Sequence, residues 1–300
     1  RTGMVSLTGV FDDVVIDGTT VNHAYLHNVD IFQKLALCPG DRIKVYKANQ
    51  IIPQIAENCV PGGVSRLPSL CPCCGSPLVI RESSGGTRQL YCDNKGCPAK
   101  LVRKFKHFCS KTRMGIEGLS ELTLEKFIRH GWIRNYGDLF QLEQHREAII
   151  ATPGFGEKSF ARLQKAIDKR RTCHLNEFVA ALGIPEVGRH AGRILNSHFH
   201  GSWTKFEQAI KDNFDFTQLT DFGQIMHDNI YTWYADVENA KLWRPALDHI
   251  TFMEEETMST TTETRHNPFY GKTVVATGKL INYTRDEIQN KLLIHGAKPT

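Results

Sequence analysis

The sequence lacks any apolar run long enough to cross a membrane. None of its stretches approaches the ~20 consecutive apolar residues that a membrane-spanning helix requires. The opening residues, RTGMVSLTGV, also lack the charged segment and apolar run that mark a secretory signal peptide. These absences predict a cytoplasmic protein with no membrane partner. The rest of the composition, 41% hydrophobic and 23% charged over 300 residues, is typical of a chain with two or more domains.

Two common nucleotide-binding signatures are also absent. The sequence contains neither a Walker phosphate loop nor the glycine fingerprint of a dinucleotide-binding fold.

An initiating methionine is missing too, and the last residues, HGAKPT, stop in the middle of a secondary-structure pattern. We therefore expect this chain to be a piece of a longer protein.

Positive charge is present in modest excess and is clustered. The net charge is +5, and residues 95–113 hold seven Lys or Arg and no acidic residue. A second run, residues 158–171, has six basic residues against one acidic residue. Such clusters attract polyanions, because each neutralised phosphate releases counterions. The alternative is that both runs are merely the solvated faces of two helices.

The cysteines are too unevenly placed for a disulfide framework. Their number is odd, no secretory signal is present, and several crowd into one short segment, which together predict a reducing compartment. The nine are Cys38, Cys59, Cys71, Cys73, Cys74, Cys92, Cys97, Cys109 and Cys173.

Four of these cysteines have the spacing of a zinc site. Cys71-x-x-Cys74 is followed by Cys92-x4-Cys97 after a spacer of hairpin length, so the two pairs can close a tetrahedron around one Zn²⁺. Four protein ligands leave no position for substrate, which predicts a structural metal. Cys73 is the spare cysteine. A redox-active C-x-x-C is the alternative, but no thioredoxin-like strand and helix surround it.

Residues 1–65 are predicted to form β-strands. Short alternating apolar runs are separated by glycine and by Asp-Gly, and DGTT at residues 17–20 is a good hairpin turn. Five or so short strands in this length suit a small, partly open barrel such as an OB-fold, which is often a platform for nucleic acid. Any other small β-barrel is the alternative.

From about residue 115 the pattern changes to helices, and a unit repeats four times. A short apolar turn with one or two glycines leads into each helix, and the turns end at Ser120, Gly156, Gly188 and Gly223. Repeats of this length imply stacked helical units. The helices are expected to bury residues at helical spacing, namely Leu124, Phe127, Ile128, Phe160, Leu163, Ile167, Ala191, Ile194, Leu195, Met226, Ile230 and Trp233.

Such turns predict a clamp for phosphate. A glycine turn at a helix start exposes backbone N–H groups at the positive end of the helix dipole, and glycine lets a DNA backbone come close. None of these groups reads bases, so binding should be independent of sequence. The candidates are Gly118, Ser120, Gly154, Gly156, Lys158, Gly188 and Gly223. Single glycine turns between helices are common, and Glu186 and Asp221 would weaken a phosphate contact in the last two turns.

The order of these features resembles the C-terminal half of a bacterial NAD⁺-dependent DNA ligase. RTG at the start, AYLHN at residues 24–28 and GDRIKVYKANQIIPQI at residues 40–55 are similar to the OB domain of that family. CPCCGSPL and CPAK match its zinc module, while GIEGLSE, GFGEKS and ALGIPEVG match its hairpins. NPFYGKTVVATGKL, from residue 267, resembles the opening of a BRCT domain. Departures include Lys47 for an arginine and Asn49-Gln50 for Gly-Asp.

The resemblance implies a multidomain chain. It comprises a small β-barrel of OB-fold type, a four-cysteine zinc finger, an all-α helix-hairpin-helix domain and the start of an α/β BRCT domain. The expected boundaries are 1–65 for the barrel, 66–100 for the zinc finger, 101–240 for the helices, 241–266 for a linker and 267–300 for the truncated BRCT domain.

The resemblance also implies a function in DNA replication and repair. The full-length enzyme would seal nicks in duplex DNA through enzyme-AMP and DNA-adenylate intermediates, using NAD⁺ and Mg²⁺. The family's nucleophilic lysine lies in Lys-x-Asp-Gly, but the single Asp-Gly here, VVIDG, has Val15 in that place. No catalytic or cofactor-binding residue is therefore expected in this chain. The adenylation lysine, NAD⁺ and Mg²⁺ would belong to an upstream adenylation domain of the same chain.

The expected partner is nicked double-stranded DNA, bound by a nucleoid-associated monomer. Carried over from the matching motifs, the DNA contacts of the barrel would be Arg1, Thr2, Lys47, Ile51 and Ile52. Two other classes stay open. A non-catalytic scaffold of OB barrel and helix-hairpin-helix units would bind DNA without a ligase reaction, and a zinc-ribbon transcription factor would show base-specific binding.

Overall fold

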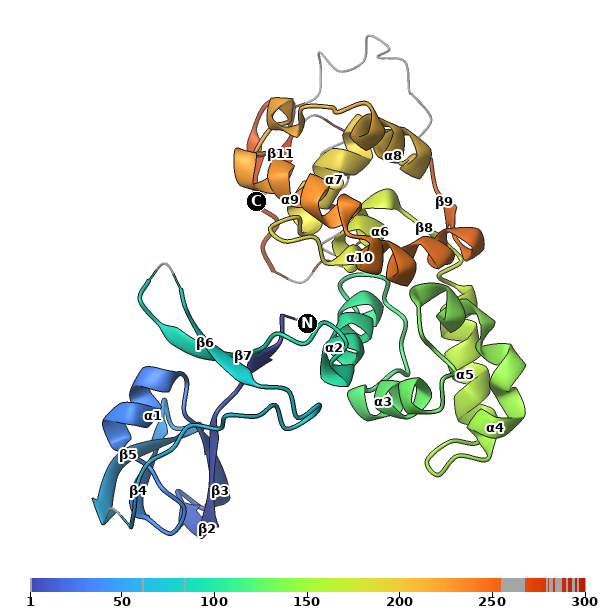
Figure 1. Ribbon diagram of the computed structural model, residues 1–300. Helices are drawn as coiled ribbons and strands as arrows, with labels where there is room; N and C mark the ends of the chain where they lie inside the picture. The colour runs from blue at the N-terminus through green and yellow to red at the C-terminus, as the bar shows by residue number, and fades with distance from the viewer. Residues whose placement is uncertain are drawn as a thin grey trace.

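The computed structural model describes most of the chain, and Figure 1 shows a small barrel, a strand hairpin beside it and a larger helical part. Arg1 lies outside the described residues, so its expected contact with DNA has no structural account. The described residues are 2–60, 62–83, 85–254, 268–278, 280, 283, 288–289, 291–292, 295 and 297–299.

Four strands form the N-terminal barrel as two antiparallel hairpins. β2 (Thr8–Ile16) pairs with β3 (Thr19–Tyr25), and β4 (Arg42–Ala48) pairs with β5 (Ile52–Val60). The first hairpin turns at Asp17-Gly18, where both residues adopt a positive φ, as an Asp-Gly pair predicts. β3 also contacts β5, so the two hairpins enclose one small core. The β-prediction for this region is confirmed.

A helix that the sequence analysis did not predict lies between β3 and β4. α1 (Val29–Leu35) begins after Asn28, whose side chain accepts a hydrogen bond of 2.8 Å from the N–H of Ile31. The helix ends at Ala36, which adopts a left-handed conformation. Val29 is fully buried and Phe32 packs against the same small core, so α1 closes the barrel.

A second strand unit follows the barrel. β6 (Leu78–Glu82) and β7 (Arg88–Cys92) form an antiparallel hairpin. β1 (Met4–Val5), although it lies at the start of the barrel segment, pairs with β7 instead of with the barrel strands. The beginning of the chain is therefore hydrogen-bonded to a hairpin some 85 residues later, as the register Met4 to Tyr91 records.

The remaining described elements are helical, apart from four short strands. The longer helices are α2 (Pro98–Cys109), α3 (Glu121–Arg129), α5 (Glu157–Asp168), α6 (Leu175–Leu182), α7 (Arg189–His198), α8 (Trp203–Lys211) and α9 (Gln224–Ala235). The shorter ones are η1 (Tyr136–His145), α4 (Arg146–Ile150), η2 (Phe216–Gln218), α10 (Val237–Trp243) and η3 (Arg244–His249). β8 (Thr172–Cys173) pairs in parallel with β9 (Thr251–Phe252).

One hydrophobic core runs through this helical part. It extends from Val102 in α2 to Ile250, and its largest fully buried side chains include Phe105, Phe127 and Trp243. Every helical position expected from the sequence to face the core is either buried or packed against the core. The helices from α2 to α10 therefore share one core.

The expected linker over residues 241–266 is wrong for its first part. Residues up to 252 form the end of α10, η3 and β9, with Trp243 1% and Ala246 0% exposed. Trp243 stacks on Trp233, and β9 pairs with β8, so tertiary packing orders this segment. The Thr/Glu-rich part of the expected linker begins only after these residues, and residues 255–266 lie outside the described residues.

Little of the expected BRCT segment, residues 267–300, is described. β10 (Thr273–Val274) pairs in parallel with β11 (Lys298–Pro299). A parallel pair joined by an intervening segment agrees with the strand–helix–strand order read from the sequence, and residues 288–289 and 291–292 are helical. Residues 267, 279, 281–282, 284–287, 290, 293–294, 296 and 300 of this segment lie outside the described part of the chain.

Candidate metal centre and helix-start turns

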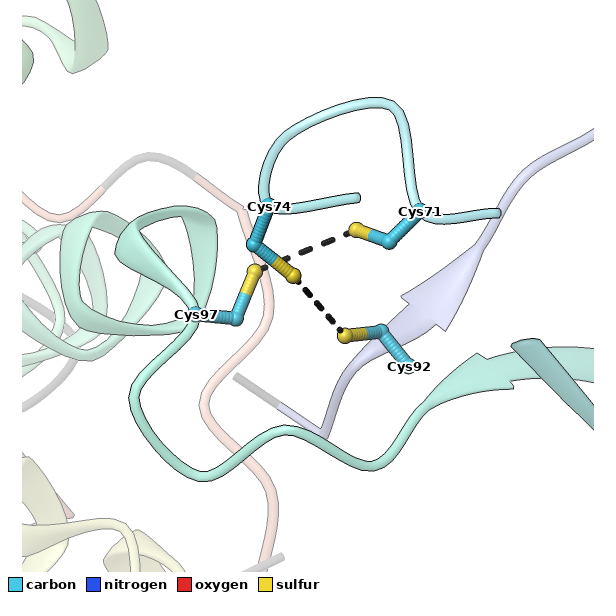
Figure 2. A group of neighbouring side chains, drawn as sticks. All are labelled: Cys71, Cys74, Cys92 and Cys97. Atoms are coloured by element: carbon cyan, nitrogen blue, oxygen red, sulfur yellow. Dashed lines mark hydrogen bonds between the residues drawn. The ribbon is translucent and has the colours of Figure 1, made fainter. Parts of the chain in front are cut away.

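The structure brings four cysteine sulfurs together between the barrel and the helices. Cys71, Cys74, Cys92 and Cys97 converge with all four Sγ atoms within 4.8 Å of one another (Figure 2). The Sγ atoms of Cys71 and Cys97 are 4.0 Å apart, and those of Cys74 and Cys92 are 3.6 Å apart. Cys73 is exposed and is not part of this group, as the spacing predicts.

The sulfur spacing suits a tetrahedral zinc ion. Zn–S bonds of about 2.3 Å in a regular tetrahedron place neighbouring sulfurs about 3.8 Å apart, between the two distances observed. Three of the four cysteines are buried, and Cys74 is half-buried. The donor set and its burial therefore fit a structural metal with four protein ligands.

Two tight turns aim these sulfurs inward. Gly75 adopts a positive φ and donates its N–H to the carbonyl of Cys71 at 2.9 Å, which folds the first Cys-x-x-Cys segment into a loop. In the second turn, the side chain of Asn94 accepts a hydrogen bond from the N–H of Gly96 at 2.9 Å. Cys97 then caps the N-terminus of α2, so the last sulfur sits at the start of a helix.

The thiols of the group have different proton affinities. The Ser76 hydroxyl lies 3.4 Å from Sγ of Cys74, and its hydrogen bond to the thiolate is the main cause that lowers the pKa of Cys74 to about 6. Burial raises the pKa of Cys97 to about 12, and burial also raises the pKa of Cys92. The group therefore includes one acidic thiol and two that favour the protonated form until a cation replaces the protons.

A backbone hydrogen bond joins this cysteine group to the start of the chain. The N–H of Cys92 donates to the carbonyl of Gly3 at 2.9 Å, within the pairing of β1 with β7. Gly3 adopts a φ of +87°, and a Cβ there would lie 2.4 Å from the carbonyl oxygen of Cys92. Only glycine fits at this position. The sequence motif RTG identified the glycine, but not this reason for it.

A polar joint also connects α1 to the β6–β7 hairpin. Asp30 accepts hydrogen bonds from the backbone N–H of Arg88 at 3.1 Å and from its Nε at 2.6 Å. These two hydrogen bonds hold the pKa of Asp30 below its usual 3.8, and the bond from the backbone N–H of Arg88 has the larger effect. Gln89 adds a hydrogen bond of 2.9 Å to the carbonyl of His27. The sequence analysis missed this joint, because its partners are about 58 residues apart.

The four turns predicted to lead into helices do so in the structure. Ser120, Gly156, Gly188 and Gly223 are the N-cap residues of α3, α5, α7 and α9, respectively. The apolar residue before each cap packs into the shared core, because Val187 and Phe222 are buried and Leu119 and Phe155 pack against it. The helix starts and the turns' inner apolar residues are therefore as predicted.

The four turns share one backbone conformation. The residue two positions before each cap has a positive φ: +93° at Gly118, +91° at Gly154, +60° at Glu186 and +62° at Asp221. In the last three turns, the N–H of the apolar residue donates to the carbonyl three residues earlier, at distances between 2.9 and 3.2 Å. This is the pattern of a type II turn, which favours glycine at the positive-φ position.

Space is open in front of the glycine caps. A Cβ built on Gly156, Gly188 or Gly223 meets no atom within 4 Å, and φ at each is negative. Protein packing therefore gives no reason for glycine at these three positions. Within the described chain, the N–H groups of Glu157 and Lys158, next along α5, have no hydrogen-bond acceptor.

The acidic residues in the third and fourth turns differ in their surroundings. Asp221 lies 2.9 Å from Nε2 of His190, near the start of α7. Both side chains are exposed. Glu186 is also exposed. The second turn carries no acid at this position, and Lys158 stands exposed beside its cap.

The barrel residues expected to contact DNA differ in their exposure and in their contacts within the protein. Thr2 is exposed, and Ile51 and Ile52 are 78% and 49% exposed at the turn between β4 and β5. Lys47 instead donates its ammonium to the carbonyl of Ile16 at 2.7 Å, so this cation is engaged inside the barrel. The turn that presents Ile51 has a positive φ at two successive residues, 50° at Asn49 and 63° at Gln50.

The described elements define a multidomain chain with a small β-barrel, a four-cysteine module and a helical domain. Residues 1–61 match the family model of the NAD-dependent DNA ligase OB-fold domain. The full chain is 37% identical to a protein named DNA ligase from Lachnoclostridium phytofermentans, and 35% identical to one from Ruminiclostridium cellulolyticum. Each alignment covers 100% of this chain and 45% of the relative.

A third relative, named DNA ligase and found in Symbiobacterium thermophilum, is 35% identical over 99% of this chain and 44% of its own length. The chain contains the OB-fold domain of the NAD-dependent DNA ligases and is similar along its whole length to proteins named DNA ligase. It spans less than half the length of these curated relatives. Among the described residues, no helix has the length and apolar character needed to cross a bilayer.

Proposed function

We propose that this chain is the DNA-gripping part of an NAD⁺-dependent ligase that seals nicks in duplex DNA through enzyme-AMP and DNA-adenylate intermediates in replication and repair. The observation that carries the proposal is the set of four equivalent helix starts, three of them capped by glycines with open space in front. Helix starts of this kind suit phosphate oxygens, because N–H donors and the helix dipole act together there. The helical repeats would be helix-hairpin-helix units, and residues 267–300 the start of a BRCT domain.

The turns would bind the sugar-phosphate backbone without reading bases. Glycine at the caps lets a phosphate approach the main chain. The side chain of any larger residue would stand between the phosphate and the backbone N–H groups. The exposed Ile51 and Ile52 of the barrel would contact the duplex from another side. Holding both ends of a nick in place speeds a reaction by orientation alone.

The cysteine group would hold one structural zinc ion. Zinc would supply a rigid crosslink among the loop at residues 71–74, the end of β7 and the start of α2. Cys97 and Cys92 would thereby fix the direction in which the helical domain leaves the barrel. Because four thiolates fill the coordination sphere, no catalytic step is assigned to this ion.

The chemical step itself is not assigned to this chain. The sequence contains no Lys-x-Asp-Gly, so the lysine that forms the enzyme-AMP adduct would come from an adenylation domain of the same protein, together with the NAD⁺ and Mg²⁺ sites. We further propose that the protein acts as a monomer on nicked duplex at the bacterial nucleoid in the cytoplasm.

Equilibrium binding of the purified chain to a fluorescent nicked duplex tests this proposal. Unlabelled nicked duplexes of unrelated sequence should compete with nearly equal affinity, because backbone contacts carry no sequence information. Binding should also weaken steeply as salt rises. No measurable duplex binding would refute the proposal, and a strong preference for one base sequence would favour a zinc-ribbon transcription factor.

A further inference from the structure

Helix α5 and its C-cap residue carry a straight row of four cations on one exposed face. Lys158, Arg162, Lys165 and Lys169 follow one another at intervals of four, three and four residues, which is the spacing of one helix face. All four are exposed. With a rise of 1.5 Å per residue, this α5 cation row extends for about 16 Å from the helix start.

The row has no partners of its own. Among the described residues, none of its four side chains makes a hydrogen bond or an ion pair. The acidic residues at the two ends of α5 are engaged elsewhere, since Glu157 pairs with Arg146 at 2.6 Å and Asp168 pairs with Arg171 at 2.9 Å. The positive charge of the row is therefore uncompensated by the protein around it.

The other basic run of the sequence, in α2, has a different setting. Arg103 pairs with Glu121 at 3.0 Å, and Lys106 pairs with the same carboxylate. The hydrogen bond from Lys106 is the main cause that lowers the pKa of Glu121. Lys104 donates to the side chain of Asn239 at 3.2 Å and is half-buried. The central cations of α2 thus serve contacts within the fold.

The row also continues directly from a helix-start turn. Lys158 lies two residues after the cap Gly156, so the four cations lead away from the open space in front of that cap. No large apolar side chain of α5 is exposed. Protein–protein interfaces need such side chains at their centre, whereas a polynucleotide backbone is bound by charge alone.

We infer that the α5 cation row binds the sugar-phosphate backbone of the DNA beyond the phosphate held at the Gly156 turn. The inference rests on the proposed function. It distinguishes between the two basic runs of the sequence, because DNA would bind to α5 and not to the centre of α2. Each neutralised phosphate contributes about 0.9 to the slope of log affinity against log salt. Removing two cations of the row should therefore lower that slope by about 2.

Two double variants of the full chain form a matched test. Arg162→Gln with Lys165→Gln removes two cations from the row, and Arg103→Gln with Lys106→Gln removes one arginine and one lysine from α2. Both variants have the same net charge, so they differ only in where the cations are lost. All four side chains lie at the surface, and thermal denaturation shows whether either variant alters folding.

The α5 variant should bind nicked duplex at least tenfold more weakly at 0.1 M salt, with the smaller salt slope. The α2 variant should stay within about threefold of the parent chain, with an unchanged slope. Equal losses in the two variants, or no loss in the α5 variant while the parent chain binds DNA, would overturn this inference alone. Absence of DNA binding by the parent chain would instead overturn the proposed function and the inference together.

Discussion

At the scale of single residues, one position recurs in each helix-start turn, two residues before the cap. It has a positive φ in all four turns, but glycine occupies it only in the first two, at Gly118 and Gly154. Glu186 and Asp221 adopt the same conformation with a Cβ, which is unfavourable for an L-residue by about 1–2 kcal/mol. The third and fourth turns are therefore strained in a way that the first two are not.

Glu186→Gly should raise the free energy of unfolding by about 0.5–1 kcal/mol, because the relief of strain exceeds the entropic cost of glycine. Glu186 is the cleaner of the two positions, since Asp221 also contacts His190. Thermal or urea denaturation of the full chain measures the change.

The reverse substitution, Gly154→Ala, supplies the control. A Cβ at Gly154 meets no atom within 4 Å, so only the φ of +91° opposes it, and stability should fall by about 1 kcal/mol. A loss of stability in Glu186→Gly would show that this side chain makes a contact that outweighs the strain.

At this scale, the sequence predicted the features that depend on residues close together in the chain. The four sulfurs that converge and the four cap residues were both identified from spacing and from glycine. The engagement of Lys47 with the carbonyl of Ile16 was not predictable, because it depends on a partner 31 residues away. The requirement for glycine at Gly3 likewise comes from Cys92, across the β1–β7 pairing.

At the scale of elements, the cysteine module joins three segments that have little core of their own. Among the described residues, the partly buried apolar side chains beside the buried sulfurs are those of Val5, Cys74 and Leu78. A module this small is expected to depend on the proposed zinc ion for stability, since a structural zinc contributes on the order of 10 kcal/mol to such a segment. The helical part, by contrast, has an extensive core that contains none of the four ligands.

Removal of zinc by a chelator should therefore unfold the module and leave the helical domain folded. Hydrogen exchange should show loss of protection in β6, β7 and β1, with protection kept in α5 and α6. One zinc ion per chain should be found before chelation. The Cys97→Ser variant should lose that ion, whereas Cys73→Ser should keep it. A metal-free chain with a fully protected β6–β7 hairpin would contradict the assignment.

Two elements escaped prediction for different reasons. α1 is short and follows a strand without a glycine or proline boundary, so its single Asn28 cap was the only local signal. The end of α10 and all of η3 fall in the segment that the sequence predicts to be a linker, yet Trp243 is among the largest fully buried side chains. A long-range contact with Trp233 orders that segment, and such contacts leave no periodic pattern in a short window.

At the scale of the whole molecule, the order of parts was predictable but their connections were not. The barrel, the cysteine hairpin and the repeated helices follow one another in the structure as the sequence indicated (Figure 1). The pairing of β1 with β7 and the joint between Asp30 and Arg88 hold the barrel to the cysteine module. Cys97 is the N-cap residue of α2, so it connects the cysteine module directly to the helical domain.

The central claim is that glycine caps these helices because a DNA phosphate, and not the protein, needs the space. The most direct measurement compares Gly156→Asn with the parent chain in both thermal stability and affinity for nicked duplex. Asparagine is at least as good a helix cap as glycine, and its Cβ has open space, so the midpoint of unfolding should stay the same or rise. Affinity should fall at least tenfold, and further in Gly156→Asp, which adds a repelling charge. Unchanged affinity in a stably folded Gly156→Asn variant would contradict the account.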